Sequence, residues 1–444
     1  MKNFRRILLI LTALFATNFL IAQCPSGSVI LTTQAEVDAF VANYPNCTSI
    51  NGHLKIAGNN ITDVSNLSYI VKTKGDFKVE NTPSLTTISF NNLTTVGHGF
   101  YIKKTGATSV SFENLETANG NNQPFLISSN SALQSLNLSK LHTIKGKLGI
   151  FSNPELLAVD LPSFVESGIS DDGYIAIKNN QKIQFVNLEK YTGSSPLEID
   201  DNVSLITINL KNLSGVGGSR YVTGIFRIKG NSSLTTLNLE NFHIADYIII
   251  EDTKLVSLNL EKVSNVEKRV SIKNNTELTD LNLSSFKSVR DLEIIANSKL
   301  TSLNSLQNIT NIYKDLTVTD NASLTDCSGL CNIINNGGVA GTTTINHNPS
   351  ECSSQIQLIK SCVSLAIGDV VDNQPTMYPN PTHHMLNIRS KNPIEKIEIF
   401  SIQGKKVFEI KNSNKMNLNA LSSGVYIVKI YSNNSFLSKK LMID

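Results

Sequence analysis

The side chains that could do chemistry are few and scattered along this chain of 444 residues. Five of its seven histidines fall in separate repeats and the other two, His383 and His384, lie in the C-terminal segment, and no His-Glu-x-x-His, Gly-x-Ser-x-Gly or phosphate-binding glycine loop is present. Two adjacent acidic pairs, Asp171-Asp172 and Asp200-Asp201, raise the question of glycoside hydrolysis, which uses paired carboxylates. However, neighbouring strand residues point to opposite faces, and Asp171-Asp172-Gly173 is typical of a turn. We therefore predict that the protein is not an enzyme and holds no metal or other cofactor. The alternative is a carbohydrate-active lyase or glycosidase that uses these four aspartates.

The six cysteines are the other reactive groups: Cys24, Cys47, Cys327, Cys331, Cys352 and Cys362. An even number in an exported chain favours disulfides over metal binding or catalysis. We expect a Cys24–Cys47 bond, whereas the other four allow three pairings, all of which stay open. The spacing Cys327-x-x-x-Cys331 could supply half a zinc site, but His347 is the only histidine near it, and export disfavours free thiols.

The N-terminus predicts that export. Residues 1–22 carry three early positive charges and the apolar run Ile7–Ala16, which is typical of a signal peptide cleaved after Ala22. Lipidation at Cys24 is the less favoured alternative, because Gln23 is not a small residue. The apolar run is too short to span a bilayer, and no later segment is longer, so we expect no transmembrane segment in the mature chain.

Composition limits the kind of partner. Charged residues make up 17% and the net charge is +3, part of which lies in the signal segment and in the C-terminal segment 376–444. The body between them is slightly acidic and has no basic stripe. Nucleic acid is therefore excluded as a partner, since its binding depends on clustered Lys and Arg.

An internal repeat organises this body. A Leu-x-Ile-x-x-Asn element, or a close variant, recurs at nearly regular intervals along it. Its anchor residues are Ile56, Val79, Ile102, Ile127, Ile150, Ile177, Ile199, Ile228, Ile250, Ile272, Ile294, Val318 and Ile345. Each repeat has two segments of period 2, so alternate side chains point inward, and stacked repeats bury them in one continuous core. We predict an all-β protein: a right-handed β-helix or leucine-rich solenoid of about 13 coils with small helical end caps.

Three sets of polar residues recur with the repeat, and we interpret all three as structural. The first is the Asn three positions after the anchor, expected to adopt the left-handed corner conformation and to bond turn backbone groups. The others point outward as an amide ladder and a ladder of alternating charge. The Asn residues after the anchors are Asn59, Asn130, Asn153, Asn180, Asn202, Asn231, Asn275, Asn297, Asn321 and Asn348. The amide ladder consists of Asn137, Asp160, Asn187, Asn209, Asn238, Asn259 and Asn282. The charge ladder consists of Lys178, Asp200, Lys229, Glu251 and Lys273.

One outward strip is apolar and is our candidate for ligand contact. Tyr101 and Leu126 precede their anchors and Phe151 follows its own, in three consecutive coils. Three lysines are expected on the same face: Lys55, Lys78 and Lys103. An exposed apolar strip beside positive charge is a plausible contact surface. The alternative is that the loop 115–124, or packing, covers it.

The ends of the stack need lids. At the N-terminal end, Thr33-Gln34-Ala35-Glu36 is a capping box that predicts a short helix. At the C-terminal end, 329–335 and 354–361 are expected to be short helices among the four late cysteines.

With Cys47–Ile56 and Gly75–Val79 as its opening pattern, the body over about 24–362 resembles the receptor L-domain family, the β-helical leucine-rich domains of insulin- and growth-factor-type receptors. The length is about twice that of one such domain, and no ligand residues of the family can be transferred.

The last segment alternates as a small antiparallel sandwich. Its strands are expected at 385–388, 394–400, 406–410, 424–431 and 435–442. It resembles the type A C-terminal sorting domain of the bacterial type IX secretion system, through Tyr378, Pro379, Asn380, Pro381, Gly404, Leu421, Gly424, Tyr426 and Lys439-Lys440-Leu441. That resemblance implies a Bacteroidetes-type bacterium, the secretion machinery as a partner, and release or surface attachment. The alternative is an ordinary accessory sandwich, and the end Met442-Ile443-Asp444 departs from the basic end usual in the family.

The predicted organisation is therefore a signal peptide at 1–22, an N-terminal cap at 23–50, a solenoid at 51–362, a linker at 363–375 and a sorting domain at 376–444. The predicted function is a non-enzymatic secreted or cell-surface binding or adhesion protein for an extracellular protein or glycan, exported through the periplasm. A eukaryotic glycan-rich wall protein is a third hypothesis, based on frequent Asn-x-Ser/Thr sequons. The end Lys439–Asp444 lacks the hydrophobic tail that such proteins use as an anchor.

Overall fold

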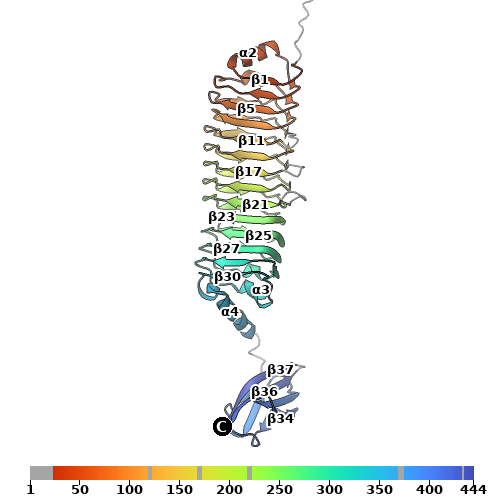
Figure 1. Cartoon of the computed structure of the whole chain (residues 1–444), viewed down its shortest axis with the longest axis vertical. Coiled ribbons are helices and arrows are strands. Elements are labelled where there is room, and N and C mark those ends of the chain that lie inside the picture. Colours follow the sequence, from red (N-terminus) through yellow and green to blue (C-terminus); the bar gives the residue numbers. More distant parts are fainter. Residues whose placement is uncertain (1–23, 119–122, 168–172, 218–222, 369–374, 433–434) are drawn as a thin grey trace, which may run out of the picture. The chain divides into compact units, whose positions relative to one another are not determined.

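The computed structural model describes residues 24–118, 123–167, 173–217, 223–368, 375–432 and 435–444. The chain divides into two compact units, residues 1–359 and 360–444. In the first unit the strands are stacked coil upon coil along the sequence, as the colours of Figure 1 show. Signal-segment residues 1–22 and the pair Asp171-Asp172 lie outside the described residues.

One long parallel sheet runs through the first unit. Its strands, in spatial order, are β1 (Val29–Leu31), β3 (Leu54–Ile56), β5 (Phe77–Thr82), β8 (Phe100–Thr105), β11 (Phe125–Ser128), β14 (Leu148–Phe151), β17 (Ile175–Lys178), β19 (Leu197–Asp200), β21 (Ile225–Lys229), β23 (Ala245–Glu251), β25 (Asn265–Lys273), β27 (Ser288–Ile295), β29 (Leu316–Thr319) and β30 (Thr343–Asn346), and β28 (Asn311–Ile312) pairs with β27. Spatial order follows chain order, so each coil contributes one strand to this sheet.

The thirteen anchors lie in one unbroken register. Each pairs directly with the anchor of the next coil, from Ile56 opposite Val79 to Val318 opposite Ile345. Leu31 of β1 extends the same register by one strand before Ile56. The predicted β-solenoid of about 13 coils is therefore confirmed.

The inward column two residues before the anchor changes in character along the stack. In the first coils it is aromatic: Phe77, Phe100 and Phe125 stack on one another with centroid distances of 5.5 and 4.2 Å. Phe90 and Phe112 meet them edge-on from the opposite wall. All five rings are fully buried, and such aromatic pairs add about 0.5–1.5 kcal/mol each beyond their buried area.

Shorter parallel sheets close the other sides of the coils. The first contains β2 (Ser49–Ile50), β4 (Lys72–Thr73), β7 (Thr95–Val96), β10 (Thr117–Ala118), β13 (Thr143–Ile144) and β16 (Glu166–Ser167), and the second contains β6 (Thr87–Ser89), β9 (Ser109–Ser111) and β12 (Ser135–Asn137). The third contains β15 (Ala158–Asp160), β18 (Phe185–Asn187), β20 (Thr207–Asn209) and β22 (Thr236–Asn238). The fourth contains β24 (Ser257–Asn259) and β26 (Asp280–Asn282). Two 3-10 turns, η1 (Ser65–Leu67) and η2 (Asn304–Leu306), take similar places in other coils.

A buried asparagine ladder joins the coils at one corner. The Oδ1 atom of Asn180 accepts the backbone N–H of Asn153 at 3.1 Å, and its Nδ2 donates to the Ile150 carbonyl at 2.9 Å. The same pattern links Asn130 to Asn231 and then Asn275 to Asn348. The structural interpretation is confirmed for these nine residues. Asn59, by contrast, is exposed and does not extend the ladder.

The left-handed corner residue is not the ladder asparagine, so that part of the prediction was wrong. Positive φ occurs one position earlier, two residues after the anchor, in twelve successive coils. Those residues are Asn81, Lys104, Ser129, Ser152, Asn179, Asp201, Gly230, Asp252, Asn274, Ala296, Asp320 and His347. The corner thus separates the two tasks: one exposed or half-buried residue adopts the left-handed conformation, and the next residue, where it is a ladder asparagine, supplies the buried hydrogen bonds.

The outward amide ladder is present only in part. Asn187 donates to Asp160 at 2.9 Å and Asn209 donates to Asn187 at 3.2 Å. Elsewhere these side chains bond the backbone N–H two residues ahead, as Asn259 does with Glu261 at 3.1 Å. Local turn bonding therefore competes with bonding between coils.

The N-terminal lid is α2 (Gln34–Asn43), and its predicted capping box is formed. Thr33 accepts from the Glu36 N–H at 3.2 Å, while the Glu36 carboxylate accepts from the backbone of Thr32 and Thr33, which keeps the Glu36 pKa below its ordinary value. The helix buries Val37 and Phe40. Beside it the structure contains the Cys24–Cys47 disulfide.

The C-terminal lid consists of η3 (Ser328–Leu330), α3 (Cys331–Asn335), η4 (Ser350–Ser353) and α4 (Gln355–Gly368). Helix α4 is longer than the predicted 354–361, and the beginning of the predicted linker, 363–368, is helical. Cys327 is bonded to Cys352, Cys331 and Cys362 are also disulfide-bonded, and no described cysteine is free.

The second unit is a pair of antiparallel sheets. One sheet contains β31 (Thr376–Tyr378), β32 (Met385–Arg389) and β35 (Lys415–Asn417); the other contains β34 (Lys406–Lys411), β33 (Lys396–Ser401), β36 (Gly424–Ser432) and β37 (Ser435–Ile443). The short strands β31 and β35 were not predicted. A core of eleven buried residues, including Ile397, Val428 and Leu441, joins the sheets.

Candidate functional site

The outward side of the long sheet carries the candidate site. Because side chains alternate along a strand, the residues just before and just after each anchor point away from the core. We call these two rows the leading column and the trailing column. Strand pairing sets Lys55, Lys78, Tyr101 and Leu126 side by side in the leading column, and Lys103 in the trailing column of the Tyr101 strand.

Charged side chains fill the later coils of this outward side. Arg227 contacts Asp200 at 2.7 Å and Glu198 at 2.9 Å, and Lys178 lies 3.2 Å from Asp200. Further along, Lys229 contacts Glu251 at 2.8 Å. The predicted ladder of alternating charge is therefore part of a wider network, because ion pairs also cross between the leading and trailing columns.

Ionisation in this network is mutually supported. The hydrogen bond from Arg227 to Asp200 raises the pKa of the Arg227 guanidinium further. Burial raises the pKa of Glu251, but hydrogen bonds from Lys229 and Ser271 outweigh that effect and leave the pKa below its ordinary value. Charges paired in this way help to hold adjacent coils in register.

The carboxylates of the enzymatic alternative are placed poorly for acid–base work. Asp200 is only 5% exposed and is held by two cations. Asp201 is a left-handed corner residue with φ of 54°. The strand alternation thus separates the pair, as the sequence predicted.

The earlier coils carry the apolar strip. The Lys78 ammonium lies 4.7 Å from the centroid of the Tyr101 ring, and the Tyr101 hydroxyl donates to Gln123 at 3.0 Å. Burial, followed by the negative charges of Asp76 and Glu80, raises the Tyr101 pKa, so the phenol is neutral. Tyr101, Leu126 and Phe151 are each half-buried.

Two of the three predicted lysines do not offer free positive charge. Lys55 lies 2.8 Å from Glu80, and Lys78 lies 2.8 Å from Asp76. Their charges are neutralised locally, so the strip is closer to neutral than the sequence indicated.

A hollow of about 410 Å³ opens where the strip meets the charged network. It is lined by Phe151, Tyr174, Ala176, Lys178, Asn179 and Glu198. The cause is two successive small residues in the leading column, Gly149 and Ala176. A Cβ atom at Gly149 would lie 2.9 Å from Cε1 of Phe151 and 3.1 Å from Cδ1 of Leu126, so both side chains lean over the glycine.

The sequence interpretation found Phe151 but missed Tyr174 and Ala176. Tyr174 lies three residues before its anchor, in an outward column that the repeat analysis did not follow. Aligning every outward column would have shown small residues in two consecutive coils beside two aromatic ones. The thirteen anchors set the register of every coil and are sufficient to make that alignment from the sequence.

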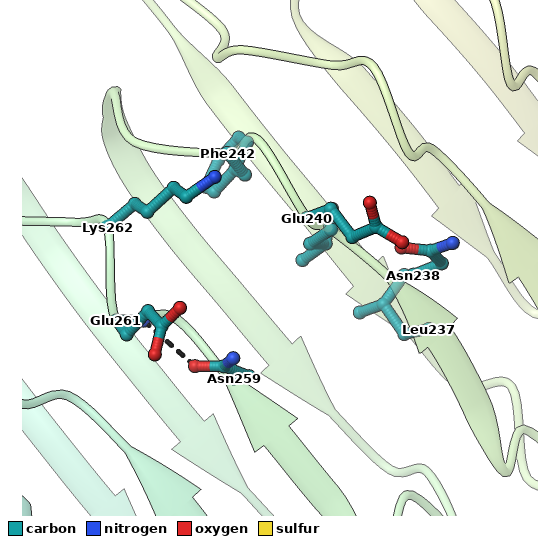
Figure 2. Close-up of a pocket in the computed structure, with 8 residues that line it drawn as sticks. Leu237, Asn238, Glu240, Phe242, Asn259, Glu261 and Lys262 are labelled. Carbon is teal, nitrogen blue, oxygen red and sulfur yellow. Dashed lines mark hydrogen bonds between the residues drawn. The ribbon is translucent and has the colours of Figure 1, made fainter.

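A second hollow, of about 380 Å³, lies on another side of the coils (Figure 2). It forms where β22 and β24 belong to separate sheets, so Asn238 and Asn259 do not continue the outward ladder. Glu240, Glu261 and Lys262 stand around it. Lys262 donates to Asn241 at 3.2 Å. We interpret this hollow as a break between two short sheets.

In the second unit the residues of the predicted sorting motif have structural contacts. Asn380 donates to the Lys440 carbonyl at 2.8 Å and accepts from the Met442 N–H at 2.8 Å, which ties the start of the unit to β37. Gly404 has φ of 82° in the turn between β33 and β34. The Tyr426 hydroxyl donates to the Ser422 carbonyl at 2.7 Å.

Comparisons with known proteins agree with both predicted resemblances. Residues 376–444 match the model of the secretion system C-terminal sorting domain, and residues 46–164 match the Receptor L domain. The chain is also 25% identical over 277 residues to the "Cell wall protein ecm33" of Schizosaccharomyces pombe. That alignment covers 61% of this chain and 60% of the relative, so the chain spans less than two thirds of that protein's length.

The sorting-domain match marks the chain as a type IX secretion protein that is secreted or attached at the outer membrane. The L-domain match and the similarity to a wall protein are consistent with a location outside the cell or at its surface. Among the described helices, none has the length and apolarity required to cross a membrane.

Proposed function

We propose that the protein is a non-enzymatic binding or adhesion protein that holds an extracellular glycan on the outward side of its long sheet. The observation that carries this proposal is the hollow at Ala176, where two aromatic side chains flank a small apolar floor. Its volume falls within the range of about 300–1,000 Å³ that is typical of small-ligand sites.

The lining of the hollow suits a sugar. Phe151 and Tyr174 offer apolar surface against which the C–H faces of a pyranose ring can pack. Lys178, Asn179 and Glu198 stand around them with donors and acceptors for hydroxyl groups. A flat protein surface would not fill such a hollow, so we favour a glycan over a protein ligand.

The proposal includes the absence of catalysis. Asp200 does not line the hollow and is paired with Arg227 and Lys178. Glu198, the acidic residue of the lining, contacts the same two cations. These contacts favour binding over glycoside cleavage.

The test is binding of the purified protein to arrays of bacterial and host surface glycans and of extracellular proteins. We expect at least one glycan to bind, and we expect the double variant Phe151→Ala/Tyr174→Ala to lose that binding. Tyr313→Ala is the matched control, because Tyr313 is 63% exposed and does not line the hollow. Binding of a protein and of no glycan would show that the ligand is a protein. Equal binding by the wild type and the double variant would show that the hollow is not the binding site.

A further inference from the structure

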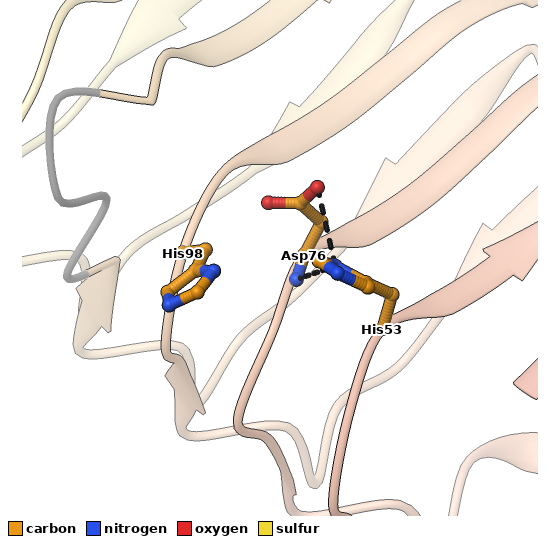
Figure 3. Close-up of side chains that lie close together, drawn as sticks. All are labelled: His53, Asp76 and His98. Atoms are coloured by element: carbon orange, nitrogen blue, oxygen red, sulfur yellow. Dashed lines mark hydrogen bonds and ion pairs between the residues drawn. The ribbon is translucent and has the colours of Figure 1, made fainter. Parts of the chain in front are cut away.

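Two histidines and one aspartate that are far apart in the sequence come together at the first coils (Figure 3). His53, Asp76 and His98 each offer a ligand atom, and these atoms all lie within 4.8 Å of one another. We infer that these three residues form a binding site for a divalent transition metal such as Zn²⁺. Imidazole nitrogen and carboxylate oxygen are ligands that Zn²⁺ accepts, and three protein ligands leave a position open for a further group.

Backbone pairing holds the three residues in place. His53 and Asp76 directly precede the paired residues Leu54 and Phe77, and His98 stands two residues before Phe100 in the next strand. Hydrogen bonds from Leu54 N–H to the Asp76 carbonyl, at 2.8 Å, and from His98 N–H to the Gly75 carbonyl, at 3.2 Å, fix the adjoining turns. Ligands held in hydrogen-bonded turns next to paired strands need little ordering when the metal binds.

The polar contacts inside the cluster conflict with one another. Nδ1 of His53 lies 2.8 Å from the backbone N–H of Asp76, a donor, and 3.2 Å from Oδ2 of Asp76, an acceptor. A single nitrogen cannot satisfy both groups at once. When it accepts the N–H, it has no proton to donate to the carboxylate, so an electron-rich nitrogen faces a negative oxygen, and a cation bound at Oδ2 relieves that repulsion.

The carboxylate is ready to act as a ligand. Asp76 is only 7% exposed, and its Oδ1 accepts the Gly99 N–H at 2.8 Å, which fixes the orientation of the group. The imidazoles can adjust: the His53 side chain is 48% exposed and the two rings are 6.1 Å apart, inclined at 62°. Small rotations bring the donors to the spacing that bonds of about 2.0–2.2 Å require.

Lys78 competes for the same carboxylate. Its Nζ lies 2.8 Å from Oδ2 of Asp76, where it repels an incoming cation. The same ammonium already lies over the Tyr101 ring and can stay there when the metal takes its place. Removing this charge should therefore strengthen metal binding.

The experiment is calorimetric titration of the metal-free, untagged protein with ZnCl2. We expect one Zn²⁺ per chain, at least tenfold weaker binding for His53→Ala and for His98→Ala, and tighter binding for Lys78→Met. Electron paramagnetic resonance of the Cu²⁺ form should show two nitrogen ligands that fall to one in either histidine variant.

Two controls separate this site from ordinary surface histidines. His347→Ala removes a histidine that lies 3.1 Å from Asp320 with no second histidine in its described surroundings, and His383→Ala/His384→Ala removes the adjacent pair in the second unit. Neither should change the affinity. The inference fails if wild-type protein binds no Zn²⁺, or if the His53 and His98 variants bind as tightly as the controls.

Discussion

The two sides of the long sheet follow different rules although they share every strand. Inward, every coil buries apolar side chains in the same register, and the buried asparagines form nearly the same hydrogen bonds from Asn130 to Asn231 and again from Asn275 to Asn348. Outward, the columns change from histidine and lysine, through aromatic and small residues, to a network of ion pairs. Stacking demands repetition only inside, so the outward side is free to vary and is where a ligand can be recognised.

The largest effect is expected at the buried ladder. Asn180→Ala removes the acceptor of the Asn153 N–H and the donor to the Ile150 carbonyl, both of which stay buried. Each unpaired buried group costs about 1–3 kcal/mol, so we expect a loss of about 3 kcal/mol in the free energy of unfolding. Urea unfolding followed by circular dichroism measures it. The outward variant Asn209→Ala should lose less than about 1 kcal/mol; equal losses would contradict the distinction between the two sides.

The outward ion pairs should matter less than the ladder. Arg227→Ala leaves Asp200 and Glu198 with Lys178 as their shared partner, and we expect a loss of about 1 kcal/mol because the group is partly exposed. Lys299→Ala breaks an exposed pair with Glu277 and should change the stability by less than about 0.5 kcal/mol. The urea midpoints of the two variants test this order, and a loss for Arg227→Ala as large as that for Asn180→Ala would refute it.

The ladder should also be extendable. Thr82 occupies a ladder position, and its buried Oγ1 has no hydrogen-bond partner. Thr82→Asn would place an amide near the Asn59 N–H and the Ile56 carbonyl, as Asn130 does two coils later with Thr105 and Ile102. We expect a gain of about 1 kcal/mol, visible as a higher urea midpoint. Thr82→Val, which adds no amide, serves as the control and should give no such gain.

Acidification should weaken the outward network selectively. The folded pKa of Glu251 is lowered by its hydrogen bonds from Lys229 and Ser271, despite burial. A lowered folded pKa means that the stabilisation is complete above the ordinary value of 4.5 and declines as the pH falls through the folded pKa. Stability measured from pH 7 downward should therefore drop below about pH 4.5. The drop should be smaller in Glu251→Gln, and an unchanged slope would show that Glu251 makes no contribution.

The sequence predicted the inward side well because its period is simple. Thirteen anchors read from aliphatic spacing pair as expected, since a slip of one residue would turn each buried side chain outward. The left-handed corner was assigned one residue too late, because Asn at that position suits both a turn and a buried hydrogen bond. In the structure this asparagine supplies the buried hydrogen bond, and the residue before it supplies the turn.

The outward side could be predicted only in part. Phe151 was identified from its own coil, whereas Tyr174 and Ala176 belong to the hollow through neighbours in adjacent coils. His53 and His98 were interpreted as scattered, although the stacking of consecutive coils brings them beside Asp76. Such neighbourhoods depend on coil length, which varies along the stack, and on turns that the repeat pattern does not determine.

The most direct test of the binding face places the same charge at two points of the leading column. Ala176→Glu fills the floor of the hollow, while Thr317→Glu changes a half-buried leading-column residue near the end of the sheet. Each new carboxylate lies opposite a glutamate of the adjacent strand, Glu198 or Glu293, and Ala176 is only 4% exposed. We therefore expect both variants to lower the free energy of unfolding, Ala176→Glu by more than Thr317→Glu. Binding is compared under conditions in which urea unfolding shows both variants to be folded. On a glycan array, Thr317→Glu should bind as the wild type does and Ala176→Glu should not bind. Equal binding by both variants would contradict the assignment of this hollow as the recognition site.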